Sequence, residues 1–355
     1  MRVGCRLALT VALAVPSLVI VSGQGTDATK ILAAAREALG GEQKLAAVKT
    51  FVATGRTRQV RGDNLVPIEF EISCELPDKY VRKDEIPAQE SGPTSTGFNG
   101  EELIQLPPSP PPPPQAARPA ATPTPPPSPG GAVVVPGAPA APAGAKPAAS
   151  GGLPPDPRKA RVAAVKQDFA KLTLGMFATS FSSYPLTFSV AGQAEAPQGR
   201  ADVIDVKGPG SFALRFFINS ETHLPIMVSW TTPVTNVVPS IPGQLPPQNL
   251  PPGAVVFQSL APPPATASKE EQDKYAKEMQ DLRKRALMQA KPIENRIYYA
   301  DYREVGNGVR FPFRLRRAVA GDTVEETNFD GFRINARIDA RRFEVVKPPT
   351  GLLPQ

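Results

Sequence analysis

The segment 293–346 alternates apolar and polar residues in the way that is typical of half-buried antiparallel strands. Two such runs, 297–303 and 309–315, flank Gly306, Asn307 and Gly308. An Asn-Gly pair supplies the positive φ angles of a tight hairpin. The pattern predicts a curved sheet with one apolar face, and the functional question is whether the protein's own side chains fill that face or a ligand does.

The same alternation of period two occurs in two further groups of segments, joined by turn residues such as Gly62 and Pro209. These predicted strands are 51–59, 66–76, 79–86, 201–207, 211–219 and 224–231. Together with the C-terminal hairpin they give at least eight to ten strands. The order of the segments favours one mostly antiparallel sheet.

Three segments show helical spacing instead. The first, 27–48, is interrupted by Gly40 and Gly41, and the second, 158–177, has apolar residues three to four positions apart. The third, 268–290, is charged and begins with a capping box formed by Ser268 and Glu271. The apolar stripe of 158–177 requires a partner, which the sheet can provide.

The 44 prolines are concentrated in two blocks, 106–157 and 233–266. Each is rich in Pro, Ala and Gly and poor in aromatic residues, so we expect both to be disordered insertions, although 255–257 could dock locally. Strand pattern continues on both sides of each block, which predicts one domain over 27–350. An insertion of about 50 residues costs only one or two kcal/mol more than a short loop, because closure entropy grows logarithmically.

The N-terminus has the form of a secretory signal peptide. Arg2 and Arg6 precede an apolar run, 7–21, and small residues then allow cleavage near Gly23. Gln24 stands where a lipoprotein would have its lipidated cysteine. We therefore predict a signal peptide over 1–23 and a soluble protein exported to the periplasm.

Composition excludes several classes of function. The net charge is +7, or +5 without the predicted signal, and no nucleic-acid-binding motif accompanies it, although membrane surface or cell wall stays open as a partner. With His223 as the one histidine and Cys74 as the one cysteine of the mature chain, a zinc or copper site and a Ser-His-Asp triad are not expected. Cys74 is in phase with apolar neighbours, which predicts a buried thiol. We predict no cofactor.

Carboxylates could still support an enzyme, and Glu69 and Glu71 are the candidates because they share one strand face. A solvated face is the simpler interpretation. The alternate arginines near the C-terminus, including Arg314, Arg316 and Arg317, are interpreted in the same way. The prediction is a protein that is not an enzyme.

The apolar side of the sheet is therefore the candidate site. Its bulky members could make a packed core with the helices or leave a cavity between sheet and helices, and both interpretations stay open. The candidate ligand-binding residues are Phe70, Ile72, Tyr80, Phe212, Leu214, Phe216, Ile226, Val228, Trp230, Tyr299, Phe311 and Phe313, with Leu315 on the same face.

Several short motifs resemble a known family. They are Ala-Arg-Glu-Ala-Leu-Gly-Gly at 35–41, Leu-Pro-Asp-Lys-Tyr at 76–80, Gly-Phe-Asn-Gly at 97–100, the strands around 301–305 and 311–313, and 334–339. With the order of elements, they are similar to exported relatives of the periplasmic lipoprotein-carrier (LolA/LolB-like) fold. The resemblance implies an α+β fold, in which a curved antiparallel sheet forms an unclosed β-barrel packed with helices and binds acyl chains. The proline-rich insertions are not part of that family's pattern.

The leading hypothesis is thus an exported, non-enzymatic protein that holds a lipid or another acyl-chain-like ligand, with lipid or lipoprotein trafficking as its context and a lipid or lipidated protein as its partner. The alternative is a structural or interaction protein whose proline-rich arms engage cell wall or a partner protein.

Overall fold

The computed structural model describes residues 27–62, 64–89, 92–107, 156–196, 199–234, 237–241, 250, 253–264 and 266–345. The predicted signal peptide and nearly all of the first proline-rich block lie outside these residues.

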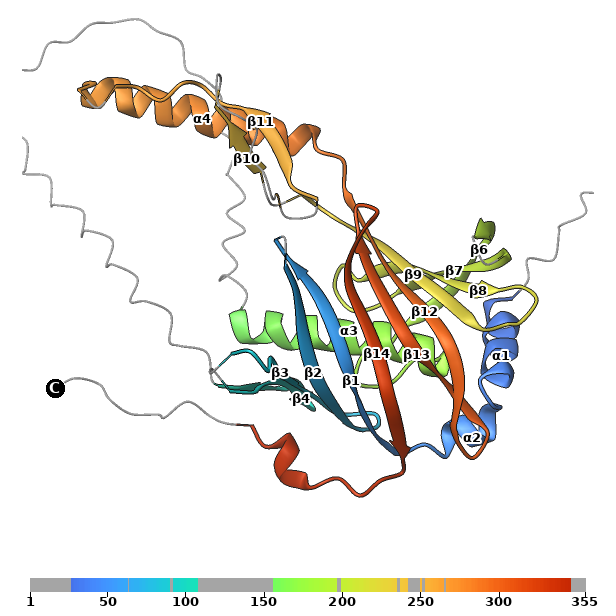
Figure 1. The fold of residues 1–355 in the computed structure, drawn as a ribbon. Coiled ribbons are helices and arrows are strands. Elements are labelled where there is room, and N and C mark those ends of the chain that lie inside the picture. Colours follow the sequence, from blue (N-terminus) through green and yellow to red (C-terminus); the bar gives the residue numbers. More distant parts are fainter. Residues whose placement is uncertain are drawn as a thin grey trace, which may run out of the picture.

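A twelve-stranded antiparallel sheet forms the body of the described structure (Figure 1). Its strand order is β5-β4-β3-β2-β1-β14-β13-β12-β9-β8-β7-β6, so the pairing of β1 with β14 joins the N-terminal strands to the C-terminal ones. The bounds are β1 Thr50–Arg61, β2 Asn64–Glu75, β3 Lys79–Glu85, β4 Thr94–Asn99, β5 Glu102–Leu106, β6 Thr187–Ala196, β7 Gly199–Lys207, β8 Ala213–Asn219, β9 Pro225–Thr232, β12 Ile293–Gly306, β13 Val309–Val319 and β14 Asp322–Ile334. β5 and β6 end the sheet without pairing to each other, which leaves it unclosed.

Helix α3, Pro157–Phe177, lies across the concave side of this sheet (Figure 1). Asp156 caps its N-terminus, and Ala178 in the left-handed region ends it. The buried ring of Phe169 packs 5.4 Å from the ring of Tyr80 and 5.3 Å from that of Phe98, between ring centroids. The apolar stripe expected for 158–177 therefore finds its partner in the sheet.

Two tyrosines of β12 tie α3 to the sheet. The Tyr299 hydroxyl donates a hydrogen bond of 2.5 Å to the carbonyl of Lys171, and the Tyr302 hydroxyl donates one of 2.8 Å to that of Gly175. Because both acceptors are on the helix backbone, these bonds fix the height of α3 above the sheet.

The remaining helices lie outside the concave side. α1 (Ala28–Ala38) and α2 (Glu42–Ala46) cover the 27–48 segment, and a 3-10 helix, Ala340–Phe343, follows the sheet. α4, Lys269–Gln289, begins with the expected capping box and packs against β10 and β11.

The fold class is confirmed as α+β with an unclosed antiparallel sheet, but β14 was not named within the segment 293–346 and five further strands were missed. β4, β5 and β6 extend the main sheet at its two ends. β10 (Val237–Ser240) and β11 (Val255–Gln258) form a separate parallel pair inside the second proline-rich block. The segment 255–257, which we expected could dock locally, thus belongs to β11, which pairs with β10 and packs beside α4.

Candidate ligand-binding site

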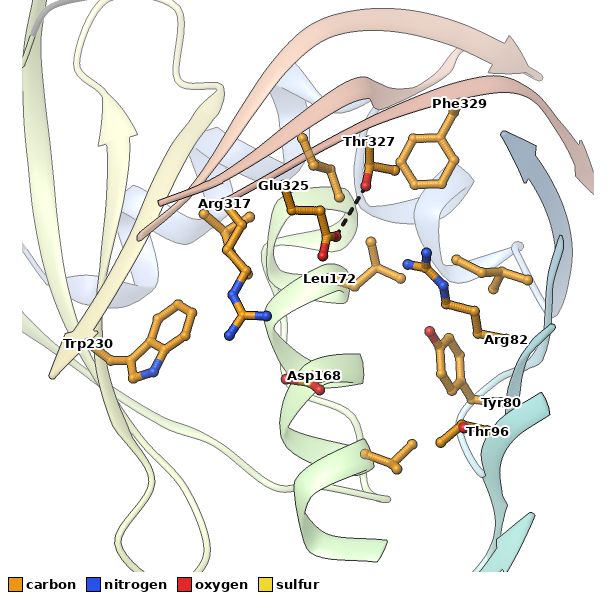
Figure 2. Close-up of a pocket in the computed structure, with 14 residues that line it drawn as sticks. Tyr80, Arg82, Thr96, Asp168, Leu172, Trp230, Arg317, Glu325, Thr327 and Phe329 are labelled. Carbon is orange, nitrogen blue, oxygen red and sulfur yellow. Dashed lines mark hydrogen bonds between the residues drawn. The ribbon is translucent and has the colours of Figure 1, made fainter. Parts of the chain in front are cut away.

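A cavity of about 300 Å³ lies between α3 and the concave face of the sheet. We call it the α3 cavity. Figure 2 shows the side chains around it. The lining residues are Ile72, Tyr80, Arg82, Thr96, Val165, Asp168, Leu172, Trp230, Ile297, Leu315, Arg317, Glu325, Thr327 and Phe329. They come from α3 and from both halves of the sheet, so residues far apart in sequence share one wall.

Three of the twelve candidate residues line the α3 cavity: Ile72, Tyr80 and Trp230. Leu315, from the same predicted face, lines it too. The other nine candidates do not line the cavity and pack in the protein interior around it. They are Phe70, Phe212, Leu214, Phe216, Ile226, Val228, Tyr299, Phe311 and Phe313. All of them are buried except Phe313, which is half-buried. One part of the apolar face thus borders a cavity, and the rest belongs to a packed core.

One wall of the cavity is organised by Arg82 of β3. Its Nε donates to the Asp84 carboxylate at 2.7 Å, and its Nη2 donates to the Thr57 hydroxyl at 3.1 Å. The guanidinium also lies 4.6 Å from the centroid of the Phe70 ring. Burial, the largest single effect, would lower the pKa of Arg82. The charges of Asp84, Tyr80 and Glu325 and the hydrogen bond to Asp84 together outweigh burial and raise the pKa above its usual value, so the side chain stays charged.

A chain of hydroxyl groups continues from this arginine across the seam between β1 and β14. The Thr57 and Thr327 hydroxyl oxygens are 2.9 Å apart and both residues are buried. Thr327 in turn donates to a carboxylate oxygen of Glu325 at 3.3 Å. The Arg82 wall and the Glu325 carboxylate are therefore linked by continuous hydrogen bonding.

The opposite wall combines an aromatic ring with an ion pair. The Lys171 ammonium lies 4.4 Å from the Trp230 ring centroid and 3.0 Å from the Asp168 carboxylate. Lys171 is buried whereas Asp168 is exposed, so the ion pair stands where the cavity opens to solvent. A cation over an indole ring is a favourable arrangement that holds Trp230 in place.

Arg317 and Glu325 complete the opening, and with Asp168 they define what we call the mouth. Arg317 of β13 is exposed and stands opposite Glu325 of β14 in the strand register. Figure 2 shows the Arg317 and Arg82 side chains entering from opposite sides, with Glu325 between them. The cavity thus combines apolar side chains with a polar wall at Arg82 and a charged mouth.

The sequence analysis did not identify the charged part of the site. Its interpretation of Arg317 is corrected by the structure. It was grouped with Arg314 and Arg316 on a solvated face, but it lines the cavity and shares the face of Leu315. A charge in phase with the apolar positions of its strand is the signal that could have found it. Arg82 gives the same signal, because it is two residues from Tyr80 on β3 and therefore lies on the same face of that strand.

The carboxylates that were weighed for an enzyme lie elsewhere. Glu69 is 3.6 Å from Arg56, and Glu71 pairs with Arg342; both acids alternate with cavity-lining Ile72 and so project from the opposite face of β2. Among the described residues, no group of three or more His, Cys, Asp or Glu could hold a metal ion. His223 is exposed in the turn between β8 and β9.

Comparisons with known proteins bear on the fold. No family model and no curated protein matches the sequence. Among solved structures, a LolA superfamily protein from Nitrosomonas europaea is similar over 90% of this chain and 97% of its own, at 10% identity and a TM-score of 0.43. A domain of an outer membrane lipoprotein-sorting protein from Vibrio parahaemolyticus is similar over 89% of this chain and 97% of its own, at 7% identity and a TM-score of 0.39.

A DUF1329 family protein from Desulfovibrio piger is similar over 90% of this chain and 97% of its own, at 6% identity and a TM-score of 0.37. The first description names the family that the sequence motifs resemble. The likeness concerns the fold. None of the described helices combines the length and hydropathy that a membrane crossing requires.

Proposed function

We propose that this chain is an exported, non-enzymatic binding protein that holds an apolar chain of an amphiphile in the α3 cavity. The observation that carries the proposal is a mostly apolar cavity with a charged mouth, formed between a helix anchored by two tyrosines and the concave face of an open sheet. Concave, mostly apolar sites with a few placed polar groups are the usual form of small-molecule sites.

The interior of the cavity suits a hydrocarbon chain. Leu172, Ile297, Leu315 and Phe329 present aliphatic and aromatic surface from α3, β12, β13 and β14. Burial of apolar ligand surface contributes roughly 25 cal/mol per Å², without requiring directional contacts. A chain of variable length is therefore a better fit than a rigid polar ligand.

The size of the cavity limits the ligand. At about 300 Å³ it is at the lower end of the range for small-molecule sites. We therefore expect one acyl chain, or part of one, inside the protein, with the headgroup at the mouth. A lipid or a lipidated protein with a single accessible chain satisfies this description.

The N-terminal segment supports export as the setting for this activity. Arg2, Arg6 and the apolar run 7–21 have the form of a secretory signal, and a periplasmic carrier would shield acyl chains from water there. Lipid or lipoprotein trafficking is the process that this combination favours. The first arm of the alternative hypothesis, 106–157, lies almost wholly outside the described residues, and no observation on the described part of the second arm favours that hypothesis.

Titration of the purified, delipidated protein with a fluorescent fatty acid tests the proposal. We expect saturable binding near one equivalent, with the blue-shifted emission of a probe in an apolar site. Native mass spectrometry of protein taken directly from the periplasm should then show a co-purified lipid of defined mass. Emission that rises linearly without saturation, together with a bare protein mass, would contradict the proposal.

A further inference from the structure

We infer that the mouth of the α3 cavity selects an amphiphile with an anionic headgroup, a carboxylate or a phosphate, and that Arg317 is the residue that binds it. This inference rests on the proposed function, because it concerns the head of the molecule whose chain the cavity would hold.

Arg317 is the cation of this site that has no partner within the described residues. Arg82 is bonded to Asp84, and Lys171 to Asp168. The contacts described for Arg317 include no hydrogen bond and no ion pair, although its side chain lines the cavity. Its guanidinium therefore keeps its fork of N–H donors, which matches a carboxylate or phosphate in bidentate geometry.

Total charge does not explain the preference. Three cations (Arg82, Lys171 and Arg317) face three acids (Asp84, Asp168 and Glu325), so the region is balanced. The distinction lies in which charges are already bound. Two of the acids are neutralised by close partners, and the third, Glu325, accepts a hydrogen bond from Thr327.

Glu325 should affect anion binding in the opposite direction to Arg317. It stands opposite Arg317 in the register of β13 and β14, so its negative charge acts on the same small volume that a bound anion would occupy. Charges in a partly desolvated site are screened less than charges in bulk water. Removing the charge of Glu325 should thus strengthen anion binding, whereas removing that of Arg317 should weaken it.

The position of Arg317 at the end of an apolar cavity sets the geometry of binding. Leu315, two residues earlier on the same face of β13, lines the apolar interior, and Arg317 is exposed at the opening. A ligand with its chain beside Leu315 would place its head beside Arg317. The order of the two residues along the strand matches the order of the two parts of an anionic amphiphile.

Calorimetric titration with four probes of equal chain length tests this inference: dodecyl phosphate, dodecanoate, dodecanol and dodecyltrimethylammonium, all below their micellar concentrations. We expect the better of the two anions to bind about tenfold tighter than dodecanol, because a charge-assisted hydrogen bond contributes that much to affinity. The tighter anion names the head chemistry. The preference should shrink as salt rises from about 0.05 to about 0.5 M.

Three variants complete the test. Arg317→Gln should remove most of the preference for anions over dodecanol, and Glu325→Gln should increase that preference. Arg314→Gln is the matched control, because it removes an identical charge from the same strand but on the face opposite to Leu315 and Arg317. It should bind all four probes as the unmodified protein does.

The outcomes separate this inference from the proposed function. If none of the four probes binds, the proposed function fails and the inference fails with it. If dodecanol binds as tightly as both anions, or if Arg317→Gln and Arg314→Gln affect anion binding equally, the inference alone is overturned and the apolar site stands.

Discussion

Gly175 of α3 faces the ring of Tyr299 of β12 so closely that a side chain does not fit between them. A Cβ atom at position 175 would lie 2.5 Å from both Cδ1 and Cε1 of the tyrosine ring. The ring is held in place because the Tyr299 hydroxyl is bonded to the Lys171 carbonyl, one helical turn earlier. This contact sets the distance between α3 and the sheet, and hence the depth of the α3 cavity.

Gly175→Ala should destabilise the protein by about 1 to 3 kcal/mol, the usual cost of an overpacked interior. Alanine would favour the helix by about 1 kcal/mol, so a net loss means that the clash dominates. Urea unfolding followed by circular dichroism measures the change.

Gly331→Ala in β14 is the matched control for this substitution. Apart from its two chain neighbours, no described residue has an atom within 4 Å of the position that its Cβ would take, and Gly331 is outside the left-handed region. Its effect should stay within about 0.5 kcal/mol. Equal effects of the two substitutions would show that α3 is not held at this distance from Tyr299.

Alkaline pH should unfold the protein through its buried tyrosines. Burial raises the pKa of Tyr80 and of Tyr299 well above the ordinary value of about 10. A raised folded-state pKa means that the folded state keeps the proton while the unfolded state loses it. The stabilisation is therefore complete below pH 10 and is lost as pH rises above 10.

Each of these tyrosines should steepen the loss of stability by up to about 1.4 kcal/mol per pH unit above pH 10. Tyr299→Phe should remove part of this slope and also lower stability at pH 8 by about 1 kcal/mol, through its lost hydrogen bond. Urea unfolding at pH 8, 10 and 11 measures both effects. An unchanged slope in Tyr299→Phe would mean that the hydroxyl titrates as if exposed.

Cys74 should be unreactive in the folded protein. It is fully buried in β2, and burial raises the pKa of its thiol well above the ordinary value. The thiolate that reacts with disulfide reagents is therefore scarce and inaccessible at pH 8. The test uses protein that lacks residues 1–23 and treats it with Ellman's reagent. The reagent should detect no thiol in the native protein and one thiol after addition of urea. Rapid labelling of the native protein would place Cys74 at the surface.

Strong periodic signals made much of the fold predictable from sequence. A few residues are enough to indicate the local structure at the Asn307 hairpin, the capping box at Ser268 and the apolar stripe through Phe169. β4 and β5 were missed because they are only six and five residues long, although Asn99 and Gly100 mark the turn between them. The parallel pair of β10 and β11 depends on contacts between distant segments, which local pattern does not reveal.

The site was harder to predict than the fold for a related reason. Apolar alternation identifies the inward face of a strand, but it does not tell which inward residues meet another side chain and which border an empty volume. Phe216 and Ile72 have the same pattern, yet only Ile72 lines the cavity. That difference arises from the position of α3, which is set by the tertiary contacts of Gly175, Tyr299 and Tyr302.

The most direct test of the central claim is to fill the α3 cavity and measure binding of the fluorescent fatty acid. Leu172→Trp adds bulk to α3 inside the cavity, and Leu260→Trp makes the same change at an exposed position beyond β11. Circular dichroism confirms that both variants are folded. The account predicts at least tenfold weaker binding for Leu172→Trp, following the usual cost of overpacking, and unchanged binding for Leu260→Trp. Full-strength binding to folded Leu172→Trp would show that the cavity is not the site.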